Sequence, residues 1–368
     1  MTHPNAKNPF EPQCLATTIG SLPHIDVPYG TELIFKNTPE IPGWVQFPKR
    51  VSHENMMVQF TEGIPGLETH DQKVFFNTQS DDFVSQITNF YTYYLDVIES
   101  NNINALNNFK LSTEYAAGFS EFINHLSSQP RTDLILKGQV TGPFTLGMNL
   151  LDQNNRCSYF DDQLHDIVVK ASALKAIWQI EKLSGFDRQI IILLDEPSLL
   201  NFGTQVCITV TREEIIRDIN EVAEAIHSRG ALAGVHCEAN TDWSILMETD
   251  LDILVFDAYD HMQSITLYPE YLKKFFKKGG SLGWGIVPTL DREAAAGETL
   301  DSLLVRFENN LEQLSNTGFD RNLLLQRALI TPSCGAGGVL TEQLAEHVLS
   351  LLKQLSETLR NRYGFGHT

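Results

Sequence analysis

The sequence has few basic residues, no long apolar run, and no regular cysteine pattern. Lysine and arginine total 27 against 46 aspartates and glutamates, which gives a net charge of -19. A surface this acidic repels a phosphate backbone, so we expect no nucleic-acid partner. No apolar run approaches the roughly 20 residues of a membrane span, and residues 1–13 lack the apolar core of a secretory signal. We therefore expect no membrane partner.

The cysteines are too few and too scattered for a disulfide framework, and their number is odd. Free thiols fit a reducing cytoplasm, where we expect the protein to reside, and they remain able to bind a metal ion. The five are Cys14, Cys157, Cys207, Cys237 and Cys334.

The sequence also lacks a glycine-rich phosphate loop, which disfavours a nucleotide-binding open sheet. Instead, short apolar runs alternate with amphipathic helical segments. The expected strands are 15–20, 103–109, 134–140, 190–195, 231–236, 252–257, 281–287 and 326–331. The expected helices include 81–99, 161–183, 212–228, 300–315 and 341–359. Eight strands interleaved with helices predict a single (β/α)8 TIM barrel, with a doubly wound open sheet as the alternative.

The domain organisation expected from this pattern is simple. Residues 1–14 form a polar extension, and residues 15–368 form one barrel domain. The interval from 21 to 103 is too long for one βα unit. We interpret residues 23–76, which contain proline, glycine and aromatic residues, as an elaborated N-terminal loop region over the barrel mouth.

Titratable side chains follow the ends of several expected strands. His236, Cys237 and Glu238 follow one strand, Asp257 closes the next, and Cys334 follows the last. The carboxyl ends of parallel strands are where ligands bind, and this mixture of side chains is typical of zinc. On spacing alone, a hydrogen-bonded histidine and a solvated glutamate explain His236 and Glu238 equally well. A cysteine such as Cys334, taken alone, is more often a buried structural thiol. Asp257 could be a ligand, a partner that orients His236, or a loop cap.

Two further groups are candidates for catalysis and binding. Asp195 and Glu196 follow the apolar run 190–194, and such a carboxylate pair can bind an amine or share a proton. The alternative is a polar strand end. Ile19, Gly20 and Ser21 could present backbone N–H groups and a hydroxyl to a substrate carboxylate.

Four segments occur, in this order, in a known family: 17–23 (TTIGSLP), 139–143 (QVTGP), 194–198 (LDEPS) and 333–335 (SCG). In these segments the chain resembles the C-terminal catalytic barrel of cobalamin-independent methionine synthase, in the superfamily that includes uroporphyrinogen decarboxylase. Two more segments, 283–289 (GWGIVPT) and 240–243 (NTDW), are typical of short, single-barrel methionine synthase-like proteins, which the chain resembles most. The resemblance runs from about residue 15 to the C-terminal helix.

The resemblance implies a zinc-dependent methyltransferase in methionine biosynthesis. The family's Zn²⁺ binds the thiol of homocysteine as a thiolate, which then attacks a methyl group carried by a folate or a corrinoid protein. Among the family's zinc ligands, His236 matches the histidine, Asp257 the acid and Cys334 the late cysteine. Glu238 stands where the family has its first cysteine.

The resemblance also assigns the amino-acid end of the substrate. Ile19, Gly20 and Ser21 match the segment that holds its carboxylate, and Asp195 matches the acid that holds its ammonium. Gln59 stands where a second ammonium-binding acid is expected. The N-terminal half of the long synthases, which contributes to folate binding, has no counterpart in this chain.

Two other interpretations remain open. One is a metal-free lyase related to uroporphyrinogen decarboxylase, which would need arginines for a polycarboxylate; Arg50 is the only arginine before Arg131. The other is a binding protein on a catalytic scaffold that has lost its activity, which the changes at Glu238 and Gln59 keep open.

Overall fold

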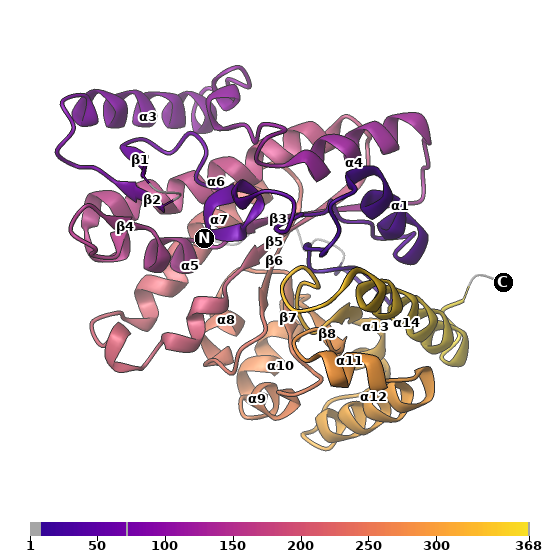
Figure 1. Cartoon of the computed structure of the whole chain (residues 1–368). Helices are drawn as coiled ribbons and strands as arrows, with labels where there is room; N and C mark the ends of the chain where they lie inside the picture. The colour runs from indigo at the N-terminus through magenta and orange to yellow at the C-terminus, as the bar shows by residue number, and fades with distance from the viewer. Residues whose placement is uncertain (1–8, 71–72, 367–368) are drawn as a thin grey trace.

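A six-stranded parallel sheet with the form of a half-barrel lies at the centre of the protein (Figure 1). The computed structural model describes residues 9–70 and 73–366. The strands adjoin one another in sequence order, so each crossover returns to the neighbouring position. They are β3 (Ile135–Thr141), β5 (Gln189–Asp195), β6 (Leu232–Cys237), β7 (Ile253–Phe256), β8 (Ser281–Val287) and β9 (Ala328–Pro332).

The central strands are buried on both faces, as expected for a parallel sheet covered by helices. In β5, Ile191 and Leu193 join a small inner cluster with Val255 and Leu329. Ile192, next to them in sequence, belongs to the large cluster that includes residues of the surrounding helices. Alternate side chains therefore fill two different cores, which explains why β5 is an almost continuous apolar run.

Fourteen α-helices are found among the described residues, most of them around the sheet. The first eight are α1 (Val27–Asn37), α2 (Met56–Gln59), α3 (Phe83–Ile98), α4 (Ala117–Ser128), α5 (Pro143–Asn149), α6 (Asp162–Ser184), α7 (Arg212–Ser228) and α8 (Trp243–Glu248). The others are α9 (Met262–Thr266), α10 (Pro269–Lys277), α11 (Arg292–Gly297), α12 (Leu300–Ser315), α13 (Arg321–Gln326) and α14 (Glu342–Arg362). The expected helices 212–228 and 341–359 are confirmed as α7 and α14. Thr211 caps α7 and Thr341 caps α14, each through its side-chain oxygen.

The prediction of a closed (β/α)8 barrel is wrong. Residues 103–109 form no strand: the segment contains a 3-10 helix, Ala105–Phe109, that buries Ala105, Leu106 and Phe109. The asparagines around it favour turns, and Asn101 takes a positive φ of 51°.

The second missing strand is 15–20, which forms only single bridges. Ala16 pairs with Ile330 of β9, and Ser21 then pairs with Gln46. Because its hydrogen bonds are divided between two partners, the segment builds no continuous ladder. Within the described residues the parallel sheet therefore has six strands, not eight.

The N-terminal region is more structured than a loop. A second, small mixed sheet consists of β1 (Leu67–His70), β2 (Lys73–Phe76) and β4 (Leu151–Asp152). Helices α1 and α2 also lie in this region. Of the expected polar extension, residues 1–8 lie outside the described residues, but Cys14 is fully buried and its backbone N–H donates to Ala328 O.

None of the helices described is both long and apolar enough to cross a lipid bilayer.

Candidate metal centre

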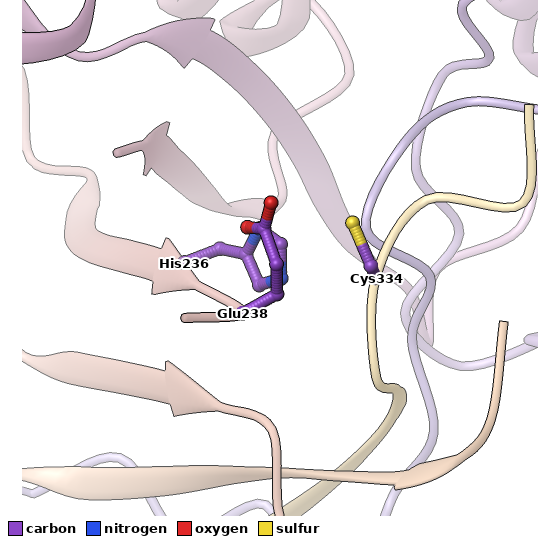
Figure 2. Close-up of side chains that lie close together, drawn as sticks. All are labelled: His236, Glu238 and Cys334. Atoms are coloured by element: carbon purple, nitrogen blue, oxygen red, sulfur yellow. The ribbon is translucent and has the colours of Figure 1, made fainter. Parts of the chain in front are cut away.

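Three side chains from two distant parts of the chain converge at the carboxyl end of the sheet (Figure 2). His236 lies near the end of β6, Glu238 follows that strand, and Cys334 follows β9. Their ligand atoms all lie within 4.8 Å of one another. Cys237 lies between the first two but is fully buried, and its Sγ donates to Ala239 O at 3.8 Å. The alternation of side chains along β6 explains why Glu238, rather than Cys237, joins His236.

The three groups fit a zinc ion. One nitrogen, one oxygen and one sulfur are each found among protein zinc ligands, at about 2.0–2.3 Å from the metal. Tetrahedral ligands at those lengths lie about 3.5 Å apart, so small side-chain rotations would close the present spacing. Three protein ligands also leave one position for a substrate atom, as catalytic zinc sites do. The cluster could therefore hold a metal ion.

His236 is held from both sides of its ring. Its Nδ1 lies 3.2 Å from Asp195 Oδ1, and its Nε2 lies 3.3 Å from Ser333 O. Burial lowers the pKa of His236, but the hydrogen bond to Asp195 and the charge of Glu238 outweigh it, so the pKa is raised overall. A carboxylate on one ring nitrogen orients the imidazole, as it does for many metal-binding histidines, and a metal bound at Nε2 would replace the contact with Ser333 O.

Cys334 is fixed through its backbone. Its N–H donates to Thr289 Oγ1 at 3.0 Å, and that hydroxyl donates to Cys334 O at 3.0 Å. Burial raises the pKa of the Cys334 thiol well above its ordinary value, and the carboxylates of Glu238 and Asp195 raise it further. A thiolate at this position therefore requires a compensating cation.

A cavity of about 260 Å³ opens beside the three residues. Asp195, Ile19 and Ser21 line it together with the predicted metal ligands. The Ser21 hydroxyl accepts a hydrogen bond from Gly337 N at 3.1 Å, so it contacts the loop that follows β9. The structure thus brings Asp195, Ile19 and Ser21 to the same cavity as the candidate metal ligands. The cavity is lined by Ile19, Ser21, Gln46, Pro48, Glu54, Asn55, Met56, Asp195, Pro197, His236, Glu238, Leu290, Cys334, Gly335, Gly337, Gly338 and Val339.

Asp257 lies outside the three-residue group. Its Oδ1 accepts hydrogen bonds from Tyr259 N at 2.8 Å and Asp260 N at 2.9 Å. Burial raises its pKa to about 6. Of the three roles left open by the sequence, the geometry corresponds to that of a loop cap.

Glu196 is directed away from the cavity. Its carboxylate accepts from Phe144 N at 3.0 Å and Thr145 N at 2.7 Å, so it caps the N-terminus of α5. Burial raises its pKa to about 7. A Cβ at Gly142 would overlap the Glu196 side chain, which shows how closely α5 fits it. Asp195 and Glu196, adjacent in sequence, therefore have different surroundings.

Gln59 does not line the cavity either. It is fully buried, its Oε1 accepts from Gln46 Nε2 at 2.7 Å, and its Nε2 donates to Tyr115 O at 2.5 Å. Gln46 is the cavity residue of this pair. Its backbone also pairs with the segment around Gly20, where a Cβ would lie 2.6 Å from Gln46 Oε1.

The sequence did not point to three residues near the cavity. Gln46 and Glu54 line it from the N-terminal region, where no periodic pattern marks them. Glu54 is buried, pairs with Arg50 through both oxygens, and accepts from Ala117 N at 2.8 Å. Lys137, fully buried in β3, donates to Ile19 O at 2.5 Å and so holds the segment that carries Ser21. In the sequence, only the i, i+4 spacing of Arg50 and Glu54 hinted at one of these contacts, because it allows an ion pair.

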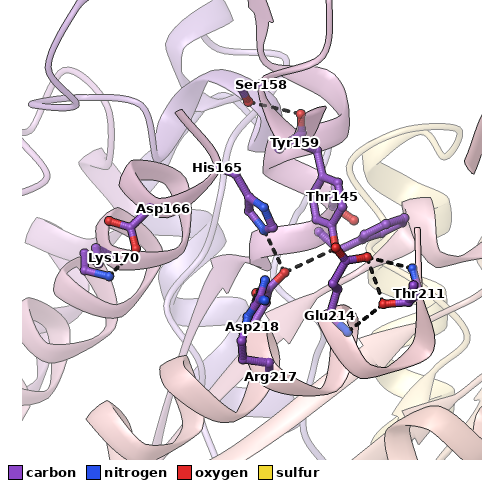
Figure 3. A network of polar contacts seen from close by, with 12 residues as sticks. Thr145, Ser158, Tyr159, His165, Asp166, Lys170, Thr211, Glu214, Arg217 and Asp218 are labelled. Carbon is purple, nitrogen blue, oxygen red and sulfur yellow. Dashed lines mark hydrogen bonds and ion pairs between the residues drawn. The ribbon is translucent and has the colours of Figure 1, made fainter. Parts of the chain in front are cut away.

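A second group of titratable side chains lies between α6 and α7 (Figure 3). Asp218 is buried and accepts from Tyr159 Oη at 3.2 Å, while its Oδ2 lies 2.7 Å from His165 Nε2. Arg217 donates to the other carboxylate oxygen. None of these four lines the cavity, and their contacts join the two helices.

Comparisons with known proteins support the fold alone. A methyltransferase from Methanosarcina mazei is similar in structure, with a TM-score of 0.53 and 10% identity, over 97% of this chain and 100% of that one. A pneumococcal exo-β-D-N-acetylglucosaminidase has a TM-score of 0.42 and 10% identity, over 94% of this chain and 84% of that one. This similarity is too low to support a conclusion about fold or function. No family model and no curated protein matches the sequence. The chain therefore has a fold similar to that of a methyltransferase.

Proposed function

We propose that this protein is a metal-dependent methyltransferase that methylates a small thiol, with Zn²⁺ bound by His236, Glu238 and Cys334. The observation that carries the proposal is the convergence of these three ligand atoms within 4.8 Å, beside a cavity at the carboxyl end of the sheet. The similarity in fold to a methyltransferase supports it further.

The bound metal would stabilise the substrate thiol as a thiolate at neutral pH. The protein's own residues hold and orient the substrate. In this proposal Asp195 orients His236, and Ser21 with the backbone around Ile19 receives the carboxylate of the substrate. Their common position on the cavity wall supports these roles. A cavity of about 260 Å³ is small for a ligand site, which favours a compact amino-acid thiol such as homocysteine.

The methyl donor in this proposal is a methyl-folate or a methyl-corrinoid protein. Its bulk would remain outside so small a cavity, with only the methyl group entering. The alternative of a polycarboxylate lyase receives little support. No arginine among the described residues lines the cavity, and the carboxylates of Asp195, Glu238 and Glu54 would repel such a substrate.

The test is product formation by zinc-loaded protein supplied with homocysteine and either methyltetrahydrofolate or methylcobalamin, with methionine measured by mass spectrometry. Thiol binding at a metal releases a proton, so calorimetry in buffers of different ionisation enthalpy counts protons independently of the donor. We expect one proton per bound thiol at neutral pH, lost in Cys334→Ala. Thiol binding without proton release in zinc-loaded protein would contradict the proposed chemistry.

A further inference from the structure

One face of α3 exposes apolar side chains to solvent. The helix lies at the edge of the molecule, away from the central sheet (Figure 1). Of the fifteen large apolar side chains that are exposed among the described residues, five fall within residues 84–103. Among them, Val84 is 75% exposed, Leu95 47% and Ile98 41%. Single exposed apolar residues are ordinary on a protein surface, but a contiguous group of them marks an interaction site.

The helical periodicity places these three residues on one strip. Residues 84, 88, 91, 95 and 98 follow one another at intervals of three and four, so they lie along the same side of the helix. We call them the outer strip of α3. The Thr88 hydroxyl donates to Val84 O at 2.8 Å and is thereby satisfied within the helix, and Tyr91 is half-buried. The face that α3 buries is a different one, with Phe83, Ile87, Phe90 and Val97.

The outer strip is uncharged, although the protein as a whole is strongly acidic. The net charge of the chain is -19, yet residues 83–95 contain no Asp, Glu, Lys, Arg or His. Acidic residues occur only near the two ends of the helix, at positions 81, 82, 96 and 99. Next to the strip, Tyr91 Oη donates to Asp166, and that carboxylate is neutralised by Lys170 at 2.5 Å. The middle of the strip therefore presents no net charge to a partner.

This combination of properties distinguishes among possible partners. A membrane surface attracts helices that carry basic residues beside the apolar ones, and α3 has no basic residue. A basic protein would be attracted to the acidic surfaces rather than to an uncharged face. A second copy of this chain carries the same charge of -19, so it is repelled by the acidic surfaces and can approach closely where charge is absent.

We propose that the outer strip of α3 packs against the same strip of a second copy, so that the protein forms a dimer. Intervals of three and four are those by which the side chains of two packed helices interdigitate. The helix has 16 residues and is about 24 Å long, so the contact is smaller than a standard interface and the dimer is reversible. No residue of α3 lines the cavity, so this proposal does not depend on the proposed function.

Sedimentation velocity of the full-length protein over a range of concentrations tests the proposal. We expect the wild type to change from monomer to dimer with a Kd of roughly 1–100 μM, as for other small interfaces. Val84→Glu removes an apolar contact from both copies and places a carboxylate in each strip. It should therefore raise the Kd by at least about 100-fold. Leu95→Gln adds no charge and should raise it by about 10-fold.

Val305→Glu is the matched control. Val305 is also an exposed valine on a helix, 61% exposed, and its helix α12 lies far from α3 (Figure 1). The substitution adds the same charge to each copy and should leave the Kd unchanged. Because Val84 and Val305 are both largely exposed, the two variants should keep the circular dichroism spectrum and the urea midpoint of the wild type.

Three results would overturn the proposal. They are a wild type that stays monomeric throughout this range, a dimer that persists in Val84→Glu, and equal weakening by Val84→Glu and Val305→Glu. The second result would place the interface elsewhere on the protein. The third would show that added charge alone controls association, wherever it is placed.

Discussion

Replacing Glu196 should reduce stability without affecting the metal site. Its carboxylate accepts from two buried backbone N–H groups, at 3.0 and 2.7 Å, at the start of α5. Hydrogen bonds to a charged group contribute about 1.5–3 kcal/mol each, so loss of both in Glu196→Ala should lower the free energy of unfolding by about 3–6 kcal/mol. Glu196→Gln keeps one acceptor and should lose about half of that. The midpoint of urea unfolding measures both losses.

The pH dependence provides a second readout. Burial raises the pKa of Glu196 from 4.5 to about 7, so the folded protein retains a proton that the unfolded chain releases. This contribution to stability is complete below pH 4.5 and is lost as the pH rises through about 7. Glu196→Gln should remove that part of the dependence.

Asp195→Asn is the matched control, because it makes the same change at the adjacent residue. It should alter stability less than Glu196→Gln, since Asp195 caps no helix, but it should disturb the histidine that it orients. In this account Glu196 supports stability, whereas Asp195 supports the histidine of the metal site. The account would be refuted if the Glu196 variants had the urea midpoint of the wild type but lost bound metal.

Three further substitutions test other parts of the structure. Asp257→Asn should retain the metal and lower the free energy of unfolding by only about 1 kcal/mol, because Oδ1 can still cap the loop. Loss of metal in this variant would show that Asp257 is a ligand. Gly20→Ala should weaken L-methionine binding at unchanged metal content, because its Cβ would lie 2.6 Å from Gln46 Oε1; unchanged binding would argue against that fit. Thr211→Ala breaks the capping box of α7 and should cost about 1 kcal/mol in urea unfolding, with no effect on metal; an unchanged midpoint would show that the cap contributes nothing.

The elements that the sequence predicted well are those whose pattern is local. Strands such as β5 and β8 are apolar runs bounded by turns, and α7 and α12 begin at capping threonines, so their bounds follow from nearby residues. Residues 103–109 have a similar apolar content, but the asparagines and the spacing of Ala105, Leu106 and Phe109 produce a 3-10 helix. Barrel closure also depends on long-range pairing, which residues 15–20 divide between two partners.

The sequence identified those site residues that have a metal-binding side chain and also lie at the end of an expected strand. His236, Glu238 and Cys334 combine ligand chemistry with that position, and they converge as expected, while their occupancy by zinc stays a prediction. Asp195 and Glu196 could not be separated, because both follow the same strand and only the structure shows that one caps α5.

The cavity residues contributed by the N-terminal region were not predictable in the same way. Gln46 and Glu54 come from irregular segments, where no period indicates which side chains face inward. Their positions depend on contacts with Gln59, Arg50 and Ala117, which are made only in the folded chain.

The most direct test of the account is the metal content per chain of protein purified without an affinity tag, measured by mass spectrometry for the wild type, His236→Ala and Cys334→Ala. Asp257→Asn provides the control with an intact three-residue group. The account predicts near-stoichiometric zinc in the wild type and the control, and its loss in both alanine variants. A wild-type protein that holds no metal even after zinc is supplied would contradict the proposed centre.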